Sequence, residues 1–213
     1  MKNKLISIIK QAGIIMLENK DANIHAKEGH YNYVTDADFK VQSFLANELK
    51  LLLPESLFFA EEKKNDELTD VPTWIVDPID GTINFMRNRK YSCISIALMK
   101  AKKPVIGLVY NPYKNELFYA EKGKGAFLNE IQLKSSNEKL DNSIINLEAA
   151  SANPFKEQFS RLIELLMGKA GDIRITGSAA IDICEVALGI ADASFAIRLS
   201  PWDYAAACLI ANE

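Results

Sequence analysis

The chain is poor in the side chains that most often build transition-metal sites. It holds three cysteines, Cys93, Cys184 and Cys208, and two histidines, His25 and His30, among 213 residues. A zinc site with cysteine and histidine ligands is therefore not expected. The cysteines are odd in number and lie far apart, one in a strand-like stretch and two in helix-like stretches. This favours buried, reduced thiols, as in a cytoplasmic protein.

Long hydrophobic runs and an excess of basic residues are also missing. No stretch approaches the roughly 18 apolar residues of a membrane span, so no membrane association is expected. Apolar residues over about 4–20 recur at helical spacing with polar residues between them, which favours an amphipathic helix over a signal peptide. The formal net charge is −3 and no basic region is concentrated, so nucleic acid is not the expected primary partner.

One segment, residues 73–85, carries most of the chemical signals: Thr-Trp-Ile-Val-Asp-Pro-Ile-Asp-Gly-Thr-Ile-Asn-Phe. Its apolar start predicts a buried strand, which Pro78 ends because proline has no N–H to donate. Asp77 and Asp80 follow at the strand's end, and Gly81 lets the backbone approach an anion that the free N–H groups beyond it can bind. Two carboxylates beside such a turn predict oxygen ligands for a hard cation such as Mg²⁺. The alternative is an ordinary turn in which Asp80 only caps the next helix.

Three further acids lie where predicted elements begin or end. Glu61 follows the strand-like run 57–60, although a solvated loop would also explain it. Asp38 stands at the third helical position after Thr35, the expected N-cap, so capping alone would account for this acid. Asp203 lies in the first turn of the last predicted helix, where any acid is favourable.

The remaining pattern predicts a protein of helices and strands in which short successive strands over 91–133 form an antiparallel sheet. A polar connection over 135–142 is the best candidate for a boundary between two halves. Helices are expected over about 4–20, 35–54, 155–166, 178–189 and 201–210, and strands over about 57–60, 74–77, 91–99, 105–110, 116–120, 143–147, 173–175 and 194–199.

Four segments together resemble the inositol monophosphatase family of lithium-sensitive, metal-dependent phosphatases. They are Ala60-Glu61-Glu62, the segment 74–85, Gly177-Ser178-Ala179-Ala180 and Pro201-Trp202-Asp203-Tyr204-Ala205-Ala206. Their order and separation also match, so the resemblance covers essentially the whole chain. It implies an α/β (α+β) layered sandwich of α-β-α-β-α type, sugar-phosphatase-like. Residues 1–140 would form one α+β subdomain with the large antiparallel sheet and most metal ligands, and 141–213 an incomplete α/β subdomain, with the site between them.

Carried over by position, the resemblance implies two or three Mg²⁺ ions. Glu61, Asp77 and the Ile79 carbonyl would hold the first ion. Asp77, Asp80 and Asp203 would hold the second ion, with Asp77 bridging. Glu61 would also help to hold a loosely bound third ion.

The resemblance also implies roles in catalysis and substrate binding. Thr82 with Asp38 would orient the attacking water, and Glu61 would act with them. The backbone N–H groups of Gly81, Thr82 and Ile83 would hold the phosphate. The remaining substrate contacts would come from Asp80, Ser178, Ala179 and Asp203.

The implied activity is Mg²⁺-dependent hydrolysis of a phosphate monoester of a small polyol or nucleotide, with inositol monophosphate first, by direct attack of water. The implied protein is a cytoplasmic homodimer acting on a small phosphorylated metabolite. Alternatives within the family are phosphatases for NADP, bisphosphate nucleotides or fructose 1,6-bisphosphate. A haloacid-dehalogenase-type phosphatase would need a nucleophilic aspartate where Pro78 stands. An alternative of another class is a non-catalytic regulator that keeps the fold and binds partners.

Three features of the sequence differ from the family's usual pattern: two substituted positions and the length of the chain. Ile83 stands where the family often has threonine, and Ala196 where animal members carry a glutamate that contacts the inositol ring. Strict inositol specificity is therefore not expected. The chain ends at Glu213, soon after the last motif, so a truncated or unusually short member is expected.

Overall fold

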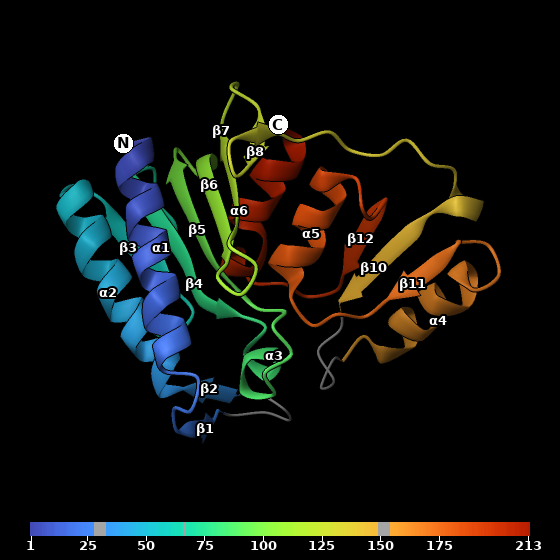
Figure 1. Ribbon diagram of the computed structural model, residues 1–213, viewed down its shortest axis with the longest axis horizontal. Helices are drawn as coiled ribbons and strands as arrows, with labels where there is room; N and C mark the ends of the chain where they lie inside the picture. The colour runs from blue at the N-terminus through green and yellow to red at the C-terminus, as the bar shows by residue number, and fades with distance from the viewer. Residues whose placement is uncertain (28–32, 66, 149–153) are drawn as a thin grey trace.

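The fold has five layers in the computed structural model, which describes residues 1–27, 33–65, 67–148 and 154–213. Figure 1 shows, from left to right, a helical layer, a seven-stranded sheet, a second helical layer, a three-stranded sheet and a single outer helix. This confirms the layered α-β-α-β-α prediction. No helix in the described part of the chain is long and apolar enough to cross a membrane.

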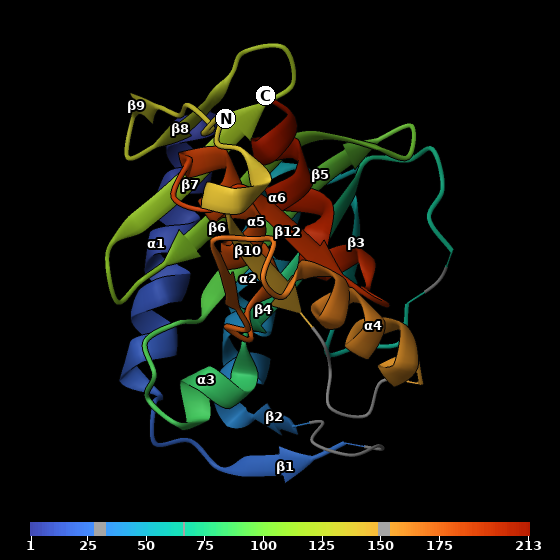
Figure 2. The same cartoon turned by 90° about the vertical axis from the view of Figure 1, so that its right-hand side faces the viewer.

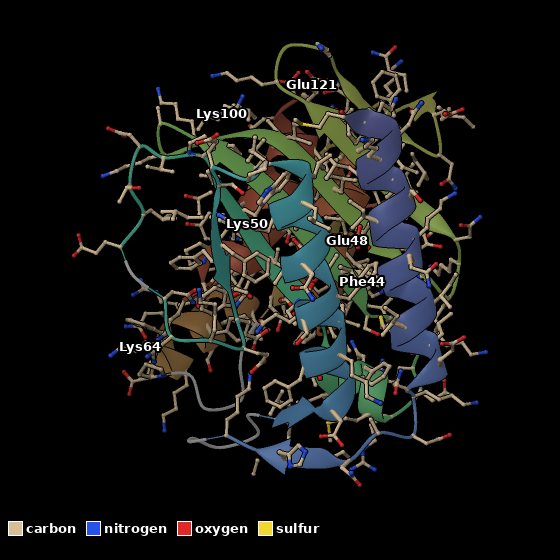
Figure 3. All side chains as sticks on the ribbon, turned by 90° about the vertical axis from the view of Figure 1, so that its left-hand side faces the viewer. Phe44, Glu48, Lys50, Lys64, Lys100 and Glu121 are labelled. Atoms are coloured by element: carbon tan, nitrogen blue, oxygen red, sulfur yellow. The ribbon has the colours of Figure 1, made fainter. Side chains whose placement is uncertain are left out.

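The first layer consists of α1 (Lys2–Glu18) and α2 (Asp36–Leu52), which lie side by side on the large sheet (Figure 3). Each helix buries one apolar stripe against the strands, as its helical spacing predicted. Between them, β1 (Ile24–Ala26) and β2 (Tyr33–Thr35) pair as antiparallel strands that were not among the strands expected from the sequence. His30 lies outside the described residues.

The large sheet has the order β3-β4-β5-β6-β7-β8-β9. The first pair is parallel and every later pair is antiparallel, as expected for the short successive strands. All eight residues of β4 are buried because helices cover both faces of the sheet. The strands are β3 (Leu57–Ala60), β4 (Thr73–Asp80), β5 (Cys93–Lys100), β6 (Lys103–Asn111), β7 (Glu116–Glu121), β8 (Ala126–Leu128) and β9 (Ile131–Gln132).

Two alanine-rich helices, α5 (Ala179–Leu188) and α6 (Pro201–Asn212), form the middle layer. α6 packs on β5 and β6 of the large sheet, while α5 packs on α6 and on the small sheet. Close approach depends on Gly107 in β6, because a Cβ atom built there would lie 2.7 Å from the Ala206 carbonyl oxygen. The small side chains thus bring the α6 backbone onto the sheet.

The small sheet has the order β11-β10-β12, and all its strands are parallel. α4 (Lys156–Leu166) covers its outer face, nearest the viewer in Figure 2, where Phe159 packs against Ile145 and Leu147. The strands of each sheet fall on one side of the predicted 140/141 boundary, whereas α5 contacts both sheets and α6, from the second half of the chain, packs on the large sheet. The two-subdomain division therefore stays a prediction. The remaining elements are α3 (Thr82–Met86), β10 (Ile144–Glu148), β11 (Asp172–Arg174), β12 (Ala193–Ala196) and the 3₁₀ turn Leu140–Asn142.

Gly107→Ala is expected to lower the free energy of unfolding by about 1–3 kcal/mol, because the new methyl group forces α6 away from the sheet. Urea unfolding followed by circular dichroism measures the change. The exposed Lys103 on the same strand provides the control, and Lys103→Ala should shift stability by less than about 0.5 kcal/mol. An unchanged urea midpoint for Gly107→Ala would contradict the proposed packing.

Candidate active site

Asp77 and Asp80 lie at the carboxyl end of β4 and are 2% and 8% exposed. The register of β4 against β5 is irregular between these two residues. Pro78 lies in this irregularity and cannot donate to the ladder. The Ile79 N–H donates to Asp77 Oδ1 at 3.0 Å. The local chemistry of the strand end thus places both carboxylates together, as predicted.

Gly81 makes the turn between β4 and α3 in the left-handed conformation, with φ of 82°. A Cβ atom at this position would lie 2.9 Å from the Gly177 carbonyl oxygen and 3.0 Å from that of Tyr91, so only glycine fits. The Thr82 hydroxyl donates to the Ile79 carbonyl at 3.2 Å, which fixes the side chain against the turn. The first turn of α3 has N–H groups without helical partners, as an anion-binding turn requires.

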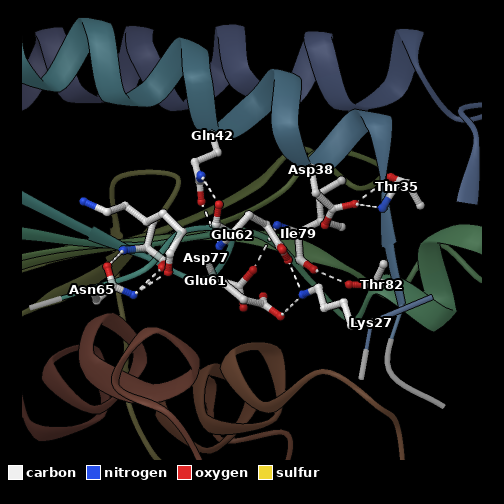
Figure 4. Close-up of polar contacts among 12 residues, drawn as sticks. Lys27, Thr35, Asp38, Gln42, Glu61, Glu62, Asn65, Asp77, Ile79 and Thr82 are labelled. Atoms are coloured by element: carbon white, nitrogen blue, oxygen red, sulfur yellow. Dashed lines mark hydrogen bonds and ion pairs between the residues drawn. The ribbon is translucent and has the colours of Figure 1, made fainter. Parts of the chain in front are cut away.

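Glu61 follows β3 and pairs with a residue that the sequence did not single out. Lys27 Nζ lies 2.9 Å from Glu61 Oε1 and also pairs with Glu62 Oε1 (Figure 4). Burial disfavours the charge on Lys27, but the two glutamates outweigh burial and raise the lysine pKa. Lys27 thus neutralises one edge of the acidic site. It was missed because a loop lysine usually points into solvent.

Asp38 is fully buried in the first turn of α2. Its Oδ2 accepts hydrogen bonds from the Thr35 N–H at 2.8 Å and the Thr35 hydroxyl at 2.6 Å, which confirms the predicted N-cap. Its Oδ1 has no partner among the described residues. Burial raises the pKa of Asp38 to about 6. Capping therefore uses one carboxylate oxygen and leaves the other available.

Asp80 and Asp203 are each held by the start of a helix. Asp80 Oδ2 accepts hydrogen bonds from the Ser178 hydroxyl at 2.6 Å and the Ala180 N–H at 2.8 Å. Asp203 Oδ2 accepts one from the Ser200 N–H at 2.7 Å, within a capping box. Burial raises the pKa of Asp80 to about 6 and that of Asp203 to about 7. Both acids are thus oriented by protein donors.

The acids that the sequence predicted lie within one another's electrostatic reach. Burial raises the pKa of Asp77 well above its ordinary value, and the negative charges of four other acids raise it further. These four are Glu61, Asp80, Asp203 and Asp38. Segments far apart in the chain therefore converge on the end of β4.

The acidic side chains suit a hard cation by their chemistry, although they do not form a closed coordination sphere. Within the described ranges, no group of three or more histidine, cysteine, aspartate or glutamate side chains is arranged to hold an ion. Their oxygens instead serve protein donors such as Lys27, Ser178 and Ser200. The donor set is nevertheless all carboxylate oxygen, buried at Asp77 and Asp80 and half-buried at Glu61 and Asp203, and oxygen ligands of this kind are what Mg²⁺ or Ca²⁺ prefers.

Asn84 is a second residue that the sequence did not assign. Its side-chain amide donates to the carbonyls of Tyr91, Thr176 and Gly177, at 2.8, 2.9 and 3.1 Å. It thereby ties the turn after β4 to the segment that leads into α5. Its position within residues 73–85 could have marked Asn84 as part of the site. However, an exposed asparagine in a short helix would give the same local sequence pattern.

Comparison with known proteins gives a match over nearly the whole chain. The model of the inositol monophosphatase family matches residues 2–213. The chain belongs to this family. It is 37% identical to inositol monophosphatase 3 of Solanum lycopersicum over 98% of the chain and 81% of the relative. It is 33% identical to the Nus factor SuhB of Escherichia coli K12 over 100% of the chain and 82% of the relative.

Solved structures of inositol monophosphatase family proteins share the fold. The extragenic suppressor protein suhB of Bartonella henselae aligns with a TM-score of 0.92 and 30% identity, over 100% of this chain and 84% of that one. An IMPase/NADP phosphatase complexed with NADP and Ca²⁺ aligns with a TM-score of 0.89 and 28% identity, over 99% of this chain and 80% of that one. The inositol monophosphatase family is metal-dependent, and this member is a phosphatase.

Without divalent cations, the protein is expected to lose stability as pH rises from about 5 to about 8. Asp77, Asp80 and Asp203 have raised pKa values when folded and ordinary values near 4 when unfolded. The folded state therefore binds more protons in this window, and raising the pH favours unfolding.

Urea midpoints measured in a chelator at pH 5.5 and 8.0 test this pH dependence. Asp77→Asn removes one of the buried charges and should reduce the difference between the two midpoints. Midpoints that stay equal or rise with pH in the wild-type protein would contradict the electrostatic account.

Proposed function

We propose that this phosphatase hydrolyses a phosphate monoester of a small polyol or nucleotide with Mg²⁺ as cofactor. Inositol monophosphate is the first candidate substrate. The observation that carries the proposal is the burial of Asp77 and Asp80, with Glu61 and Asp203 in electrostatic reach, beside the Gly81 turn. Carboxylate oxygens next to an anion-binding turn suit a metal-assisted phosphatase better than a nucleophilic mechanism.

Two or three Mg²⁺ ions would be held by the acids at the end of β4. Glu61, Asp77 and the Ile79 carbonyl would hold the first, Asp77, Asp80 and Asp203 the second, and Glu61 would help to hold a third. When bound, such ions neutralise phosphate oxygens and make a bound water more acidic. Magnesium is proposed because the donors are all oxygen.

The chain's own groups would position the water and the phosphate. Asp38 Oδ1 has no partner among the described residues, so it can accept a hydrogen bond from an attacking water. The Thr82 hydroxyl already donates to the Ile79 carbonyl, so it can only accept from that water. The backbone N–H groups of Gly81, Thr82 and Ile83 would hold the phosphate without adding a titrating proton. Water would thus attack directly, with no covalent phosphoenzyme.

The alcohol portion of the substrate would lie beside the start of α5. Asp80, Asp203, Ser178 and Ala179 are the proposed contacts. The Ser178 hydroxyl donates to Asp80, so its lone pairs are what remain for a ligand. The Gly177–Ser178 segment lies directly against the Gly81 turn, since a Cβ atom at position 81 would be 2.9 Å from the Gly177 carbonyl oxygen and 3.3 Å from the Ser178 Cβ.

Other substrates and a second class of function have specific support. The named NADP phosphatase among the structural neighbours supports a nucleotide substrate, and fructose 1,6-bisphosphate is a further candidate. The relative named as a Nus factor supports a partner-binding regulatory role. We favour catalysis because every proposed metal-binding acid is present.

We also propose that Li⁺ inhibits the protein and that the protein is a cytoplasmic homodimer. Its primary partner would be a small phosphorylated metabolite rather than nucleic acid or a membrane.

Asp77→Asn is expected to lower kcat by at least about a hundredfold, because a neutral amide is a poor ligand for a divalent cation. Phosphate release from inositol 1-phosphate with Mg²⁺ measures the loss, and circular dichroism checks the fold. Asp172→Asn, a change at an exposed acid on β11, serves as control and should keep wild-type activity. Full activity in Asp77→Asn would refute the assigned role.

A panel of phosphate esters tests the proposed substrate class. Inositol monophosphates should give the highest kcat/KM with Mg²⁺, ahead of nucleotides, NADP and fructose 1,6-bisphosphate, and Li⁺ should inhibit. A higher kcat/KM for NADP would replace the polyol assignment by the nucleotide one. No phosphate release from any ester would favour the regulatory role.

A further inference from the structure

A second group of buried polar side chains lies between β10 and α5, next to the acids of the candidate site. Asn146 and Glu148 are two residues apart on β10 and so share one face of the strand. Asn146 Nδ2 donates to Glu185 Oε2 at 2.9 Å and approaches the Asp182 carbonyl oxygen at 3.4 Å. This face of β10 therefore packs against α5.

Three oxygen atoms in this group are buried without any hydrogen-bond partner in the described part of the chain. They belong to Asn146 (Oδ1), Asp182 (Oδ2) and Glu148 (Oε2). Buried polar atoms are nearly always paired in folded proteins, so each free atom calls for an explanation. Asn146 and Asp182 are fully buried, whereas Glu148 is only partly buried at the strand end. Glu148 is thus the one of the three residues whose side chain keeps some exposure, although its Oε2 atom is buried.

The carboxylate of Glu148 lies beside the segment that positions Asp80. It accepts a hydrogen bond from the Gly177 N–H, and the next residue, Ser178, donates to Asp80 at 2.6 Å. The Gly177 carbonyl oxygen is also the atom that a Cβ at position 81 would meet, at 2.9 Å. One exposed turn therefore separates Glu148 from both Asp80 and Gly81.

Strand direction and electrostatics agree with this placement. In Figure 1 the arrowheads of β4 and β10 point to the same end of the molecule, where α3 lies. Burial, together with the charges of Asp80, Asp182 and Asp203, raises the pKa of Glu148 to about 8. Because this neighbourhood is already negative, a neutral hydroxyl is a better partner for Glu148 than a second anion.

We propose that Glu148 is a substrate-binding residue whose free oxygen, Oε2, accepts a hydrogen bond from a hydroxyl of the alcohol portion of the substrate. The proposal rests on the proposed function and narrows it to polyol monophosphates. The hydroxyl satisfies a buried acceptor that lacks a partner in the protein, so an ester without that hydroxyl leaves the acceptor unpaired. Glu148 thereby determines which alcohol is accepted and takes no part in the attack on phosphorus.

Comparing two esters in the same variants tests this role. Inositol 1-phosphate carries hydroxyl groups on its alcohol portion, and phenyl phosphate carries none. Glu148→Ala should lower kcat/KM for inositol 1-phosphate about tenfold or more, the range for losing a hydrogen bond whose partner is left unpaired in a buried place. The value for phenyl phosphate should stay within about twofold. Glu148→Gln should recover most of the loss, because its amide oxygen still accepts a hydrogen bond.

Glu185→Ala is the matched control, since it disturbs the same contact between β10 and α5 but leaves Glu148 Oε2 in place. It should leave the ratio of the two kcat/KM values unchanged. Thermal unfolding checks each variant. If Glu148→Ala does not fold, Glu148→Asp replaces it, because the shorter side chain withdraws the oxygen and should show the same selective loss.

The outcomes separate this proposal from the proposed function. Equal losses on both esters, or no loss on either, would overturn the role of Glu148 while the wild-type activity stands. A wild-type protein that releases phosphate from neither ester would overturn the proposed function and this proposal with it.

Discussion

The main physical constraint on this structure is the repulsion among several carboxylates that are gathered at the end of β4. Asp77 is almost fully enclosed, and the charges of Glu61, Asp80 and Asp203 reach it. Like charges in a protein interior repel strongly, so such a group is unfavourable unless protons or cations offset the charge. Lys27 offsets part of it at the edge, where it pairs with Glu61 and Glu62. The chain therefore gives up stability here to keep oxygen ligands in place, which is a common feature of functional sites.

Hydrogen bonds hold these acids in position from two distant parts of the chain. Asp80 accepts from Ser178 and Ala180, about one hundred residues further on. Asn84 donates to carbonyls on both sides of the site, including Thr176 and Gly177. The turn proposed to hold phosphate and the helix proposed to face the alcohol thus form one connected unit. Preorganisation of this kind lets polar groups act without a large rearrangement when a ligand binds.

The parts of the fold and site that the sequence predicted are those with strong local chemistry. The Gly81 turn and the Thr35–Asp38 capping box each follow from residue type and spacing, and the structure has both. The prediction that Pro78 ends the strand was wrong, because β4 continues to Asp80 and Pro78 only makes its pairing with β5 irregular. The β1–β2 hairpin was missed because its three-residue strands carry no alternating apolar pattern.

Glu148 was missed for a different reason, since an acid at the end of a strand has no motif of its own. Its environment is created by tertiary contacts between β10 and α5. The metal-binding roles depend in the same way on distances between distant side chains, which spacing along the chain does not determine. They remain predictions, as does the 140/141 subdomain boundary.

The position of Asp203 shows how packing of small residues serves the site. Gly107 and Ala206 let α6 lie directly on β6. Ser95 on β5 is the cross-strand partner of Asp77, and its hydroxyl donates to the Trp202 carbonyl at 3.2 Å. Because Trp202 immediately precedes Asp203, the register of β5 against β4 sets where this acid stands relative to Asp77. The sheet therefore positions two acids that lie more than a hundred residues apart in sequence, and a change in helix packing would alter the site as directly as the loss of a ligand.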